Sequence, residues 1–280
     1  MDTLETDRPV GAIVALKSGE YAKSRLDLPV PLRQRLAWTM ALDTLRALTG
    51  AVPHVMVVTA QPALASRLAR AGIQVEVVPE PPQSGMNTAL AYGASRLRAA
   101  GAATVLACVG DLPALRVSSV QRVIAAAQAF PRAFLPDTSG VGTTMLVANG
   151  EQLDPHFQGR SAARHRASGA VSLTAELLGE PVTDARHDVD SEVDLATVIG
   201  LGVGRHTAAL IDPQTARLGS YQQITATGAV DDHGRQLAVT AAGRRIPLAP
   251  SALADGLRHA RSGQRLHAVT SPDCVLSAWL

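Results

Sequence analysis

A carboxylate at the end of one apolar run is the first residue of this chain whose position suggests chemistry. Residues Val105–Val109 are continuously apolar, Gly110 and Asp111 follow directly, and Pro113 keeps the run from continuing as a strand. A continuous apolar run of this length is typical of a strand buried on both faces of a parallel sheet. Open parallel sheets bind ligands beyond the carboxyl ends of their strands. We therefore expect Asp111 to hold a cation there, and a cation in that place indicates phosphates.

A second pair of carboxylates lies late in the chain, at Asp188 and Asp190, on either side of Val189. On an extended segment alternate side chains share a face, so both carboxylates can approach one metal ion. Mg²⁺ suits such a site because it is bound by few carboxylates together with water and phosphate oxygens. The alternative is that both residues are ordinary turn or cap residues.

The lysines form the third candidate feature. The chain has two, Lys17 and Lys23, and both fall with Arg25 in a charged loop after the first apolar run. A lysine is a compact charge on a flexible stem and suits phosphate oxygens. Gly85 and Asn87 mark the start of a later helical pattern, where backbone N–H groups favour anions. A chance placement of the lysines in a solvated loop is the alternative.

The elements that must position these residues alternate between two patterns. Apolar runs predict strands over residues 11–16, 54–59, 74–78, 104–109, 132–135 and 143–148. Helical spacing predicts helices over 31–48, 61–71, 86–100, 117–129 and 191–199. Gly50 is read as the residue just past the end of the first helix, and Ser191 with Asp194 as a capping box. This alternation predicts an α/β fold with a Rossmann-like, mostly parallel sheet.

The pattern changes near Arg205. Beyond it, β-like runs over 222–227, 237–241, 265–270 and 274–279 are separated by short glycine-containing turns. Strands at this spacing predict a small all-β barrel of the cold-shock or OB type. We therefore divide the chain into a first domain of residues 1–205 and a second of residues 206–280, whose role the sequence leaves open.

Composition excludes several classes of protein. A net charge of +2 with no basic block does not suggest nucleic acid as a partner. Cys108 and Cys274 make neither a metal-binding spacing nor a disulfide framework. The first residues lack the features of a signal peptide, and no apolar run approaches the length of a membrane span. We expect a cytoplasmic protein without a membrane segment.

Residues 11 to about 204 resemble the guanylyltransferases of deazaflavin coenzyme F-420 biosynthesis, which join GMP to a three-carbon phospho-acid. The resemblance is carried by Lys23-Ser-Arg-Leu26, Asn87-Thr-Ala89, Gly110-Asp-Leu-Pro113, Gly142-Thr143, Ser161-Ala-Ala-Arg-His165 and Asp188-Val-Asp190. Of these, the Ser161 segment and the Lys23 segment are the most specific, because related nucleotidyltransferases share Gly-Asp-Leu-Pro. The family has a Rossmann-like nucleotidyltransferase sheet, in agreement with the strand and helix patterns.

The resemblance implies roles for the residues at the metal and nucleotide sites. Asp111 and Asp188 match the family's Mg²⁺ ligands, and Asp190 lies beside them. Lys17, Lys23 and Arg25 match the loop that meets the triphosphate of GTP. These are the same residues that their positions after strands and their charges suggest as candidates for metal and phosphate binding.

The resemblance also implies a site for the phospho-acid. Thr143 and Ser161 match residues that hold it, and the third contact aligns with Gln158, where the family more often has glycine. His165 could either meet the carboxylate of the phospho-acid or belong to a solvated helix face.

Together these observations predict a Mg²⁺-dependent guanylyltransferase that uses GTP and acts on phosphoenolpyruvate or on 2-phospho-L-lactate, with phosphoenolpyruvate favoured. One alternative is another nucleotidyltransferase of this fold, with a molybdopterin or sugar-phosphate acceptor. A second is a nucleic-acid-binding role for the C-terminal barrel, although its few aromatic residues argue against it. The oligomeric state is left open, with a homo-oligomer among the options.

Overall fold

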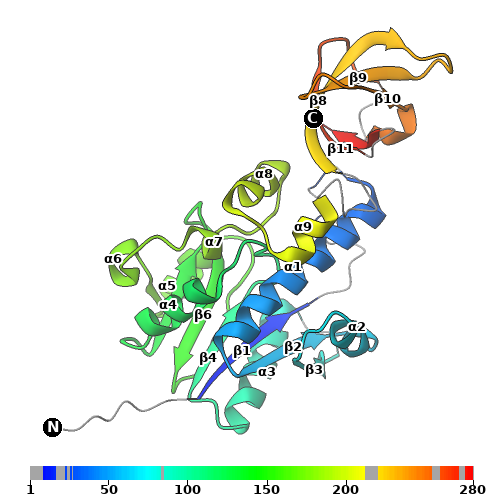
Figure 1. Ribbon diagram of the computed structural model, residues 1–280. Coiled ribbons are helices and arrows are strands. Elements are labelled where there is room, and N and C mark those ends of the chain that lie inside the picture. The colour runs from blue at the N-terminus through cyan, green and yellow to red at the C-terminus, as the bar shows by residue number, and fades with distance from the viewer. Residues whose placement is uncertain are drawn as a thin grey trace.

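The computed structural model describes residues 9–16, 23, 26, 28–82, 85–211, 220–253, 259–270 and 275–279. Within them, seven strands form one sheet in the order β3-β2-β1-β4-β6-β5-β7 (Figure 1). The strands are β1 (Val10–Ala15), β2 (His54–Thr59), β3 (Glu76–Pro79), β4 (Thr104–Cys108), β5 (Arg132–Pro136), β6 (Thr143–Asn149) and β7 (Val171–Ser172). Strands β3, β2, β1 and β4 pair in parallel, whereas β6 runs antiparallel to both β4 and β5. The predicted mostly parallel α/β sheet is confirmed.

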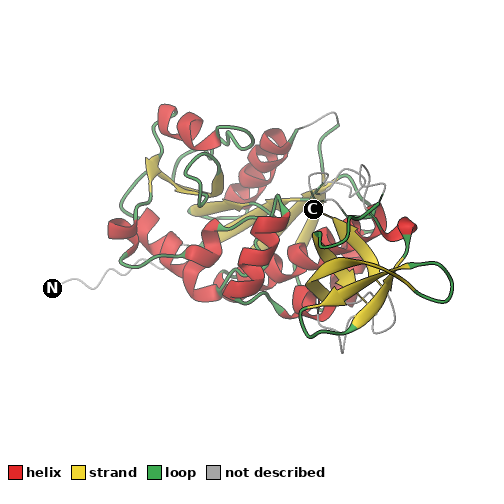
Figure 2. Cartoon of the chain, turned by 90° about the horizontal axis from the view of Figure 1, so that it is seen from above, coloured by secondary structure: helices red, strands yellow, loops and turns green. Residues whose placement is uncertain are grey.

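Helices cover both faces of this sheet (Figure 2). Along β1, Ala12 and Val14 pack on one face with α1 (Val30–Ala51), α2 (Leu64–Arg70) and α4 (Val117–Ala127). Ile13 and Ala15 point to the other face and pack with α3 (Met86–Ala99) and α5 (Ser161–Ala167). Because both faces are covered, the central strands are apolar at consecutive positions, as the sequence pattern indicates.

The first helix runs further than the sequence predicts. Gly50 was expected just past its end, but α1 continues through Gly50 to Ala51. A Cβ atom on Gly50 would lie 2.8 Å from Cγ2 of Val117, the first residue of α4. Gly50 therefore permits the close approach of two helices and does not terminate one.

A third cluster of apolar side chains packs under the N-terminal half of α1. It joins α1 to α8 (Glu192–Leu201) and α9 (Arg205–Ile211), with Val189, Leu195 and Leu210 among its buried members. The predicted capping box of Ser191 and Asp194 is present at the start of α8. Helix α9 was not expected from the sequence; it lies along α1 (Figure 1).

The C-terminal strands form a separate antiparallel sheet with the order β10-β9-β8-β11-β12 in the described residues (Figure 1). They are β8 (Ser220–Val230), β9 (Gln236–Thr240), β10 (Arg245–Leu248), β11 (Arg265–Thr270) and β12 (Val275–Trp279). Leu253 bridges to Ala278 of β12, so the segment after β10 meets the opposite edge of the sheet. The predicted all-β character of this region is confirmed. Among the described helices of the chain, none is long and apolar enough to cross a membrane.

Candidate active site

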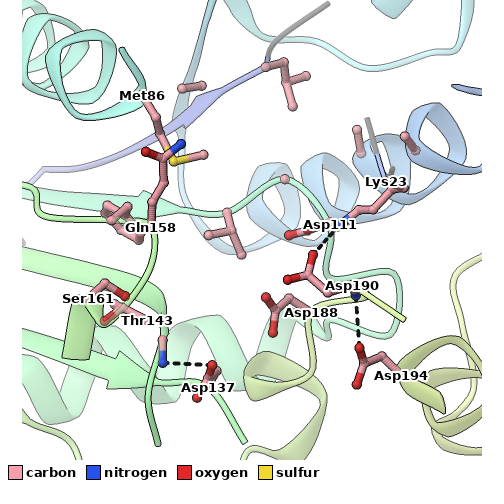
Figure 3. A pocket seen from close by; sticks show the side chains of 18 of the residues that line it. Lys23, Met86, Asp111, Asp137, Thr143, Gln158, Ser161, Asp188, Asp190 and Asp194 are labelled. Atoms are coloured by element: carbon pink, nitrogen blue, oxygen red, sulfur yellow. Dashed lines mark hydrogen bonds and ion pairs between the residues drawn. The ribbon is translucent and has the colours of Figure 1, made fainter. Parts of the chain in front are cut away.

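A cleft of about 1360 Å³ opens where the parallel strands end. Its walls come from the ends of β1 and β4, from the loop between β5 and β6, and from two later segments, residues 157–161 and 186–190 (Figure 3). This is the edge at which an open parallel sheet binds its ligands. The cleft therefore gathers segments that are far apart in the sequence.

Three carboxylates meet on one side of the cleft. Oxygen atoms of Asp111, Asp188 and Asp190 lie within 4.8 Å of one another. The three side chains gather at the same place in Figure 3. Asp111 follows the end of β4, and the other two flank Val189, which is fully buried and anchors their segment between α7 (Thr183–Arg186) and α8. The structure thus brings together the three residues that the sequence singled out as metal ligands.

The crowding of negative charge changes the pKa of Asp188. Burial, followed by the charges of Asp111 and Asp190, raises it to about 7, although Lys23 opposes the shift. Carboxylates packed this closely favour the uptake of either a proton or a cation. The cluster therefore has the charge and the oxygen ligands that suit a divalent cation.

Lys23 lies against these carboxylates and does not point to open solvent. Its Nζ forms an ion pair with Asp111 and lies 3.3 Å from Oδ1 of Asp190. Burial lowers the pKa of Lys23, but the neighbouring carboxylates, Asp111 foremost, outweigh this and leave the pKa raised. Lys17 and Arg25, predicted to share the task of Lys23, lie outside the described residues.

The other side of the cleft presents hydroxyl groups. Thr143 begins β6 and Ser161 begins α5; both residues are buried yet line the cleft (Figure 3). The N–H of Ala162 donates to the carbonyl of Val141 at 3.0 Å, which ties the start of α5 to the start of β6. Thr143 Oγ1 lies 3.0 Å from Nδ1 of His165, and among the described residues the Ser161 hydroxyl has no hydrogen-bond partner. The structure brings together Thr143 and Ser161, as predicted.

Gln158 occupies a backbone conformation that glycine adopts more readily. Its φ is +77° and that of the next residue, Gly159, is +53°. Left-handed backbone of this kind favours glycine, in agreement with the glycine that the resemblance implies for this position. The side chain of Gln158 lies toward Met86 in Figure 3, and Gln158 lines the cleft.

Gly85 and Asn87 lie at the start of α3. Gly85 is the N-cap residue, in extended backbone and without a side chain to cover the helix end. The amide of Asn87 accepts from the N–H of Phe157 at 2.7 Å and donates to its carbonyl at 3.3 Å. Asn87 therefore holds the segment that leads to Gln158, a contact that the sequence did not indicate.

Sequence reasoning also missed the residue that shapes the β5–β6 loop. The carboxylate of Asp137 accepts from the Ser139 hydroxyl at 2.8 Å and from the N–H groups of Val141 and Gly142 at 3.1 and 2.9 Å. A Cβ atom on Gly142 would lie 2.4 Å from Oδ2 of Asp137, so this position requires glycine. The signal in the sequence was an aspartate just before a Gly-x-Gly turn.

Two further contacts made by residues that line the cleft were not indicated by the sequence. Arg186 donates to the carbonyls of Pro136 and Asp137, both at 3.0 Å, and joins the β5–β6 loop to the segment of Asp188. On the far wall, the guanidinium of Arg67 stacks 4.2 Å from the ring centre of Trp38.

Comparison with known proteins identifies the family of this chain and some of its relatives. A family model, the MobA-like NTP transferase domain, matches residues 28–181, more than half of this chain. A phosphoenolpyruvate guanylyltransferase of Streptomyces coelicolor is 46% identical over 204 residues, which cover 71% of this chain and 93% of that protein. One of Geodermatophilus obscurus is 42% identical over 213 residues, covering 73% and 94%. A nucleotidyl transferase structure from Methanothermobacter is 18% identical, covers 69% of this chain and 97% of its own, and has a TM-score of 0.48.

The mostly parallel sheet, with carboxylates gathered beyond β4, belongs to the nucleotidyltransferase class. The chain is a member of the MobA-like NTP transferase family and, within it, of the family of the phosphoenolpyruvate guanylyltransferases. The resemblance found in the sequence motifs is confirmed.

Proposed function

We propose that this protein transfers GMP from GTP to phosphoenolpyruvate and releases pyrophosphate, as a step in coenzyme F-420 biosynthesis. The observation that carries the proposal is the likeness to phosphoenolpyruvate guanylyltransferases, which extends over 93% and 94% of two of these relatives at 46% and 42% identity. The two sides of the cleft, one acidic and one lined by hydroxyls, supply the groups that such a reaction needs.

The reaction requires charge neutralisation and alignment more than acid–base chemistry. A phosphate oxygen of the acceptor forms a bond to the α-phosphorus of GTP, the bond from that phosphorus to the bridging oxygen breaks, and pyrophosphate leaves. The attacking oxygen is already ionised at neutral pH, so a general base is not needed. The barrier comes from bringing two anions together, which positive charge and oriented hydrogen bonds lower.

The carboxylate cluster fits a magnesium ion. Asp111, Asp188 and Asp190 would hold it, because they offer hard oxygen ligands within 4.8 Å of one another and carry more negative charge than Lys23 offsets. Bound there, Mg²⁺ would shield the phosphates that meet during transfer. Lys23, already beside the cluster, would keep its charge and face phosphate oxygens next to the carboxylates.

The remaining nucleotide contacts follow from position. Lys17 and Arg25 are proposed to meet the triphosphate with Lys23. Gly85 leaves the N-terminal N–H groups of α3, a helix of 14 residues, uncovered by a side chain. We assign Gly85 and Asn87 to the nucleotide for this reason, with Asn87 also holding the backbone of Phe157.

The hydroxyl side of the cleft would take the phospho-acid. Thr143 and Ser161 are short donors that line the cleft and are suited to phosphate or carboxylate oxygens. Gln158 lies in the same wall, and its left-handed backbone turns the chain beside them.

The direct test offers the purified protein GTP and Mg²⁺ with one candidate acceptor at a time and identifies products by mass spectrometry. Phosphoenolpyruvate should give its GMP adduct and pyrophosphate. An adduct with 2-phospho-L-lactate alone would reassign the acceptor. Product with a sugar phosphate or a molybdopterin, and with neither phospho-acid, would overturn the proposal.

A further inference from the structure

A buried histidine lies behind the hydroxyl side of the cleft. His165 on α5 has no exposed surface, and its ring packs against those of Phe134, His156 and Phe157 at centroid distances of 5.7, 5.9 and 5.2 Å. It is thus neither a direct contact of a ligand in the cleft nor part of a solvated helix face, the two readings that the sequence left open.

Both ring nitrogens of His165 have partners. Nε2 lies 2.9 Å from the backbone nitrogen of His156, and Nδ1 lies 3.0 Å from Oγ1 of Thr143. A backbone N–H is always a donor, so Nε2 must be the acceptor and cannot carry a hydrogen. The neutral ring then carries its hydrogen on Nδ1 and donates it to Thr143.

This assignment fixes the direction of the next hydrogen bond. The oxygen of Thr143 accepts from His165, so its own hydrogen is left to donate. Among the described residues, that hydrogen has no acceptor, and Thr143 lines the cleft. The His156 N–H therefore donates to His165, and His165 donates to Thr143. The hydroxyl of Thr143 is left as a donor to a ligand in the cleft.

We propose that His165 is a positioning residue, which holds the Thr143 hydroxyl as a donor aimed at an anionic oxygen of the acceptor substrate. The identity of that substrate rests on the proposed function, but the polarity of the hydrogen bonds does not.

The charge state of the ring agrees with this role. Burial, followed by electrostatic interactions with His156 and Arg164, lowers the pKa of His165 to about 4, against the opposing effect of Asp154. The ring is therefore neutral at neutral pH, as acceptance of the His156 N–H requires. In a charged ring Nε2 would carry a hydrogen, and this N–H would face the N–H of His156 with no acceptor between them.

Two substitutions separate the two halves of the imidazole. In H165N the side-chain nitrogen can take the place of Nδ1 and donate to Thr143, but nothing accepts from His156. In H165Q the side-chain oxygen can reach the place of Nε2 and accept from His156, but nothing donates to Thr143. We expect H165Q to raise the KM for phosphoenolpyruvate about fivefold, the worth of one hydrogen bond. H165N should stay within about twofold of the wild type, and the KM for GTP should change in neither.

Thr143 supplies the matched pair of controls. T143V should raise the KM for phosphoenolpyruvate at least as much as H165Q, whereas T143S keeps a hydroxyl and should raise it less than T143V does. Adding H165Q to T143V should bring no further increase, because both remove the same donor. If H165Q resembles the wild type and H165N is impaired, His165 only supports the backbone of His156 and the proposal is wrong.

The tautomer can be measured without any substrate. Long-range ¹H–¹⁵N spectra of the full chain with ¹⁵N-labelled histidine should show a neutral His165 with hydrogen on Nδ1, assigned by the signal missing in H165Q. A ring protonated on Nε2 at neutral pH would overturn this inference and leave the proposed function untouched. A wild-type protein that makes no product from phosphoenolpyruvate would overturn the proposed function while the tautomer stands.

Discussion

At the scale of single residues, the proposed role of the three carboxylates in holding Mg²⁺ can be tested directly. We expect D111N and D188N each to abolish nucleotidyl transfer, because the side chain keeps its size and loses the charge that would hold Mg²⁺. Activity measured against Mg²⁺ concentration checks this, with D232N, in the exposed turn between β8 and β9, as the control. Turnover near the wild-type rate in either variant would make that carboxylate structural.

Asp188 should also make the stability of the metal-free protein depend on pH. Its pKa is raised from 3.8 to about 7 in the folded state, so the folded protein binds more protons than the unfolded chain between those values. Stability therefore falls as pH rises through this window, and the penalty is complete above about pH 7. At about pH 8 we expect D188N to have a higher free energy of unfolding than the wild type, by at most about 4 kcal/mol, measured by urea denaturation. The gain should vanish toward about pH 4. A gain that is the same at both pH values would contradict the raised pKa as its cause.

Lys23 offers a test of competition between an ammonium group and a metal ion. It pairs with Asp111 and Asp190, the same carboxylates that would hold Mg²⁺. K23A should raise the KM for GTP about tenfold or more through the loss of a charged contact to phosphate. In the absence of nucleotide it should bind Mg²⁺ more tightly, because the competing charge is gone; calorimetric titration measures this. An unchanged KM for GTP would mean that Lys23 only balances the charge of the carboxylates and does not contact the nucleotide.

At the scale of elements, α4 shows how the start of a helix is held by a residue far away in the sequence. Arg116, its N-cap residue, provides no side-chain cap. Instead Asp184 of α7, itself buried, accepts from the Arg116 N–H and the Ser119 hydroxyl, both at 2.8 Å. We expect D184A to lower the free energy of unfolding by about 1–3 kcal/mol. The change removes the cap of α4 and leaves the Arg116 N–H and the Ser119 hydroxyl without their acceptor.

The surface pair of Arg122 and Glu180 provides the comparison for that experiment. Both side chains are largely exposed, at 40% and 58%. E180A should therefore change the free energy of unfolding by less than about 1 kcal/mol. Urea denaturation of both variants decides the point: equal effects would mean that Asp184 adds nothing beyond a surface charge.

At the scale of the whole molecule, the question is whether the first domain needs α9 in order to be stable. The sequence-based division at Arg205 stays a prediction, but the buried carboxylate of Asp43 accepts from the N–H groups of His206 and Thr207 at 3.0 and 2.8 Å. We expect a fragment ending at Ile211 to fold and retain transfer. A fragment ending at Gly204 should be less stable by at least about 2 kcal/mol, because Asp43 loses both donors. Equal denaturation midpoints would contradict this, and D43A in the full chain should reproduce the loss.

Several features of this protein could be predicted from the sequence because their cause is local. The run before Asp111 is apolar at consecutive positions because its strand is buried on both faces, and this places Asp111 at the carboxyl end of β4. Asp188 and Asp190 share a side because alternate residues do so on an extended segment. Parallel pairing then brings Asp111 to the ligand-binding edge of the sheet, whereas the segment of Asp188 and Asp190 belongs to no strand and is held there by the packing of Val189.

The remaining contacts join residues whose separation in the chain carries no local signal. Thr143 and His165 are 22 positions apart, Ser119 and Asp184 are 65 apart, and Lys23 and Asp190 are 167 apart. The pattern of α5 shows arginines on either side of His165, which is equally consistent with a solvated face; packing against Phe134 and Phe157 decided that the ring is buried. Sequence by itself determined the fold class and the place of Asp111 at a strand end, because residue periodicity and strand direction encode them. Tertiary structure alone decided which buried groups face each other, because hydrogen-bond partners are chosen by proximity in space.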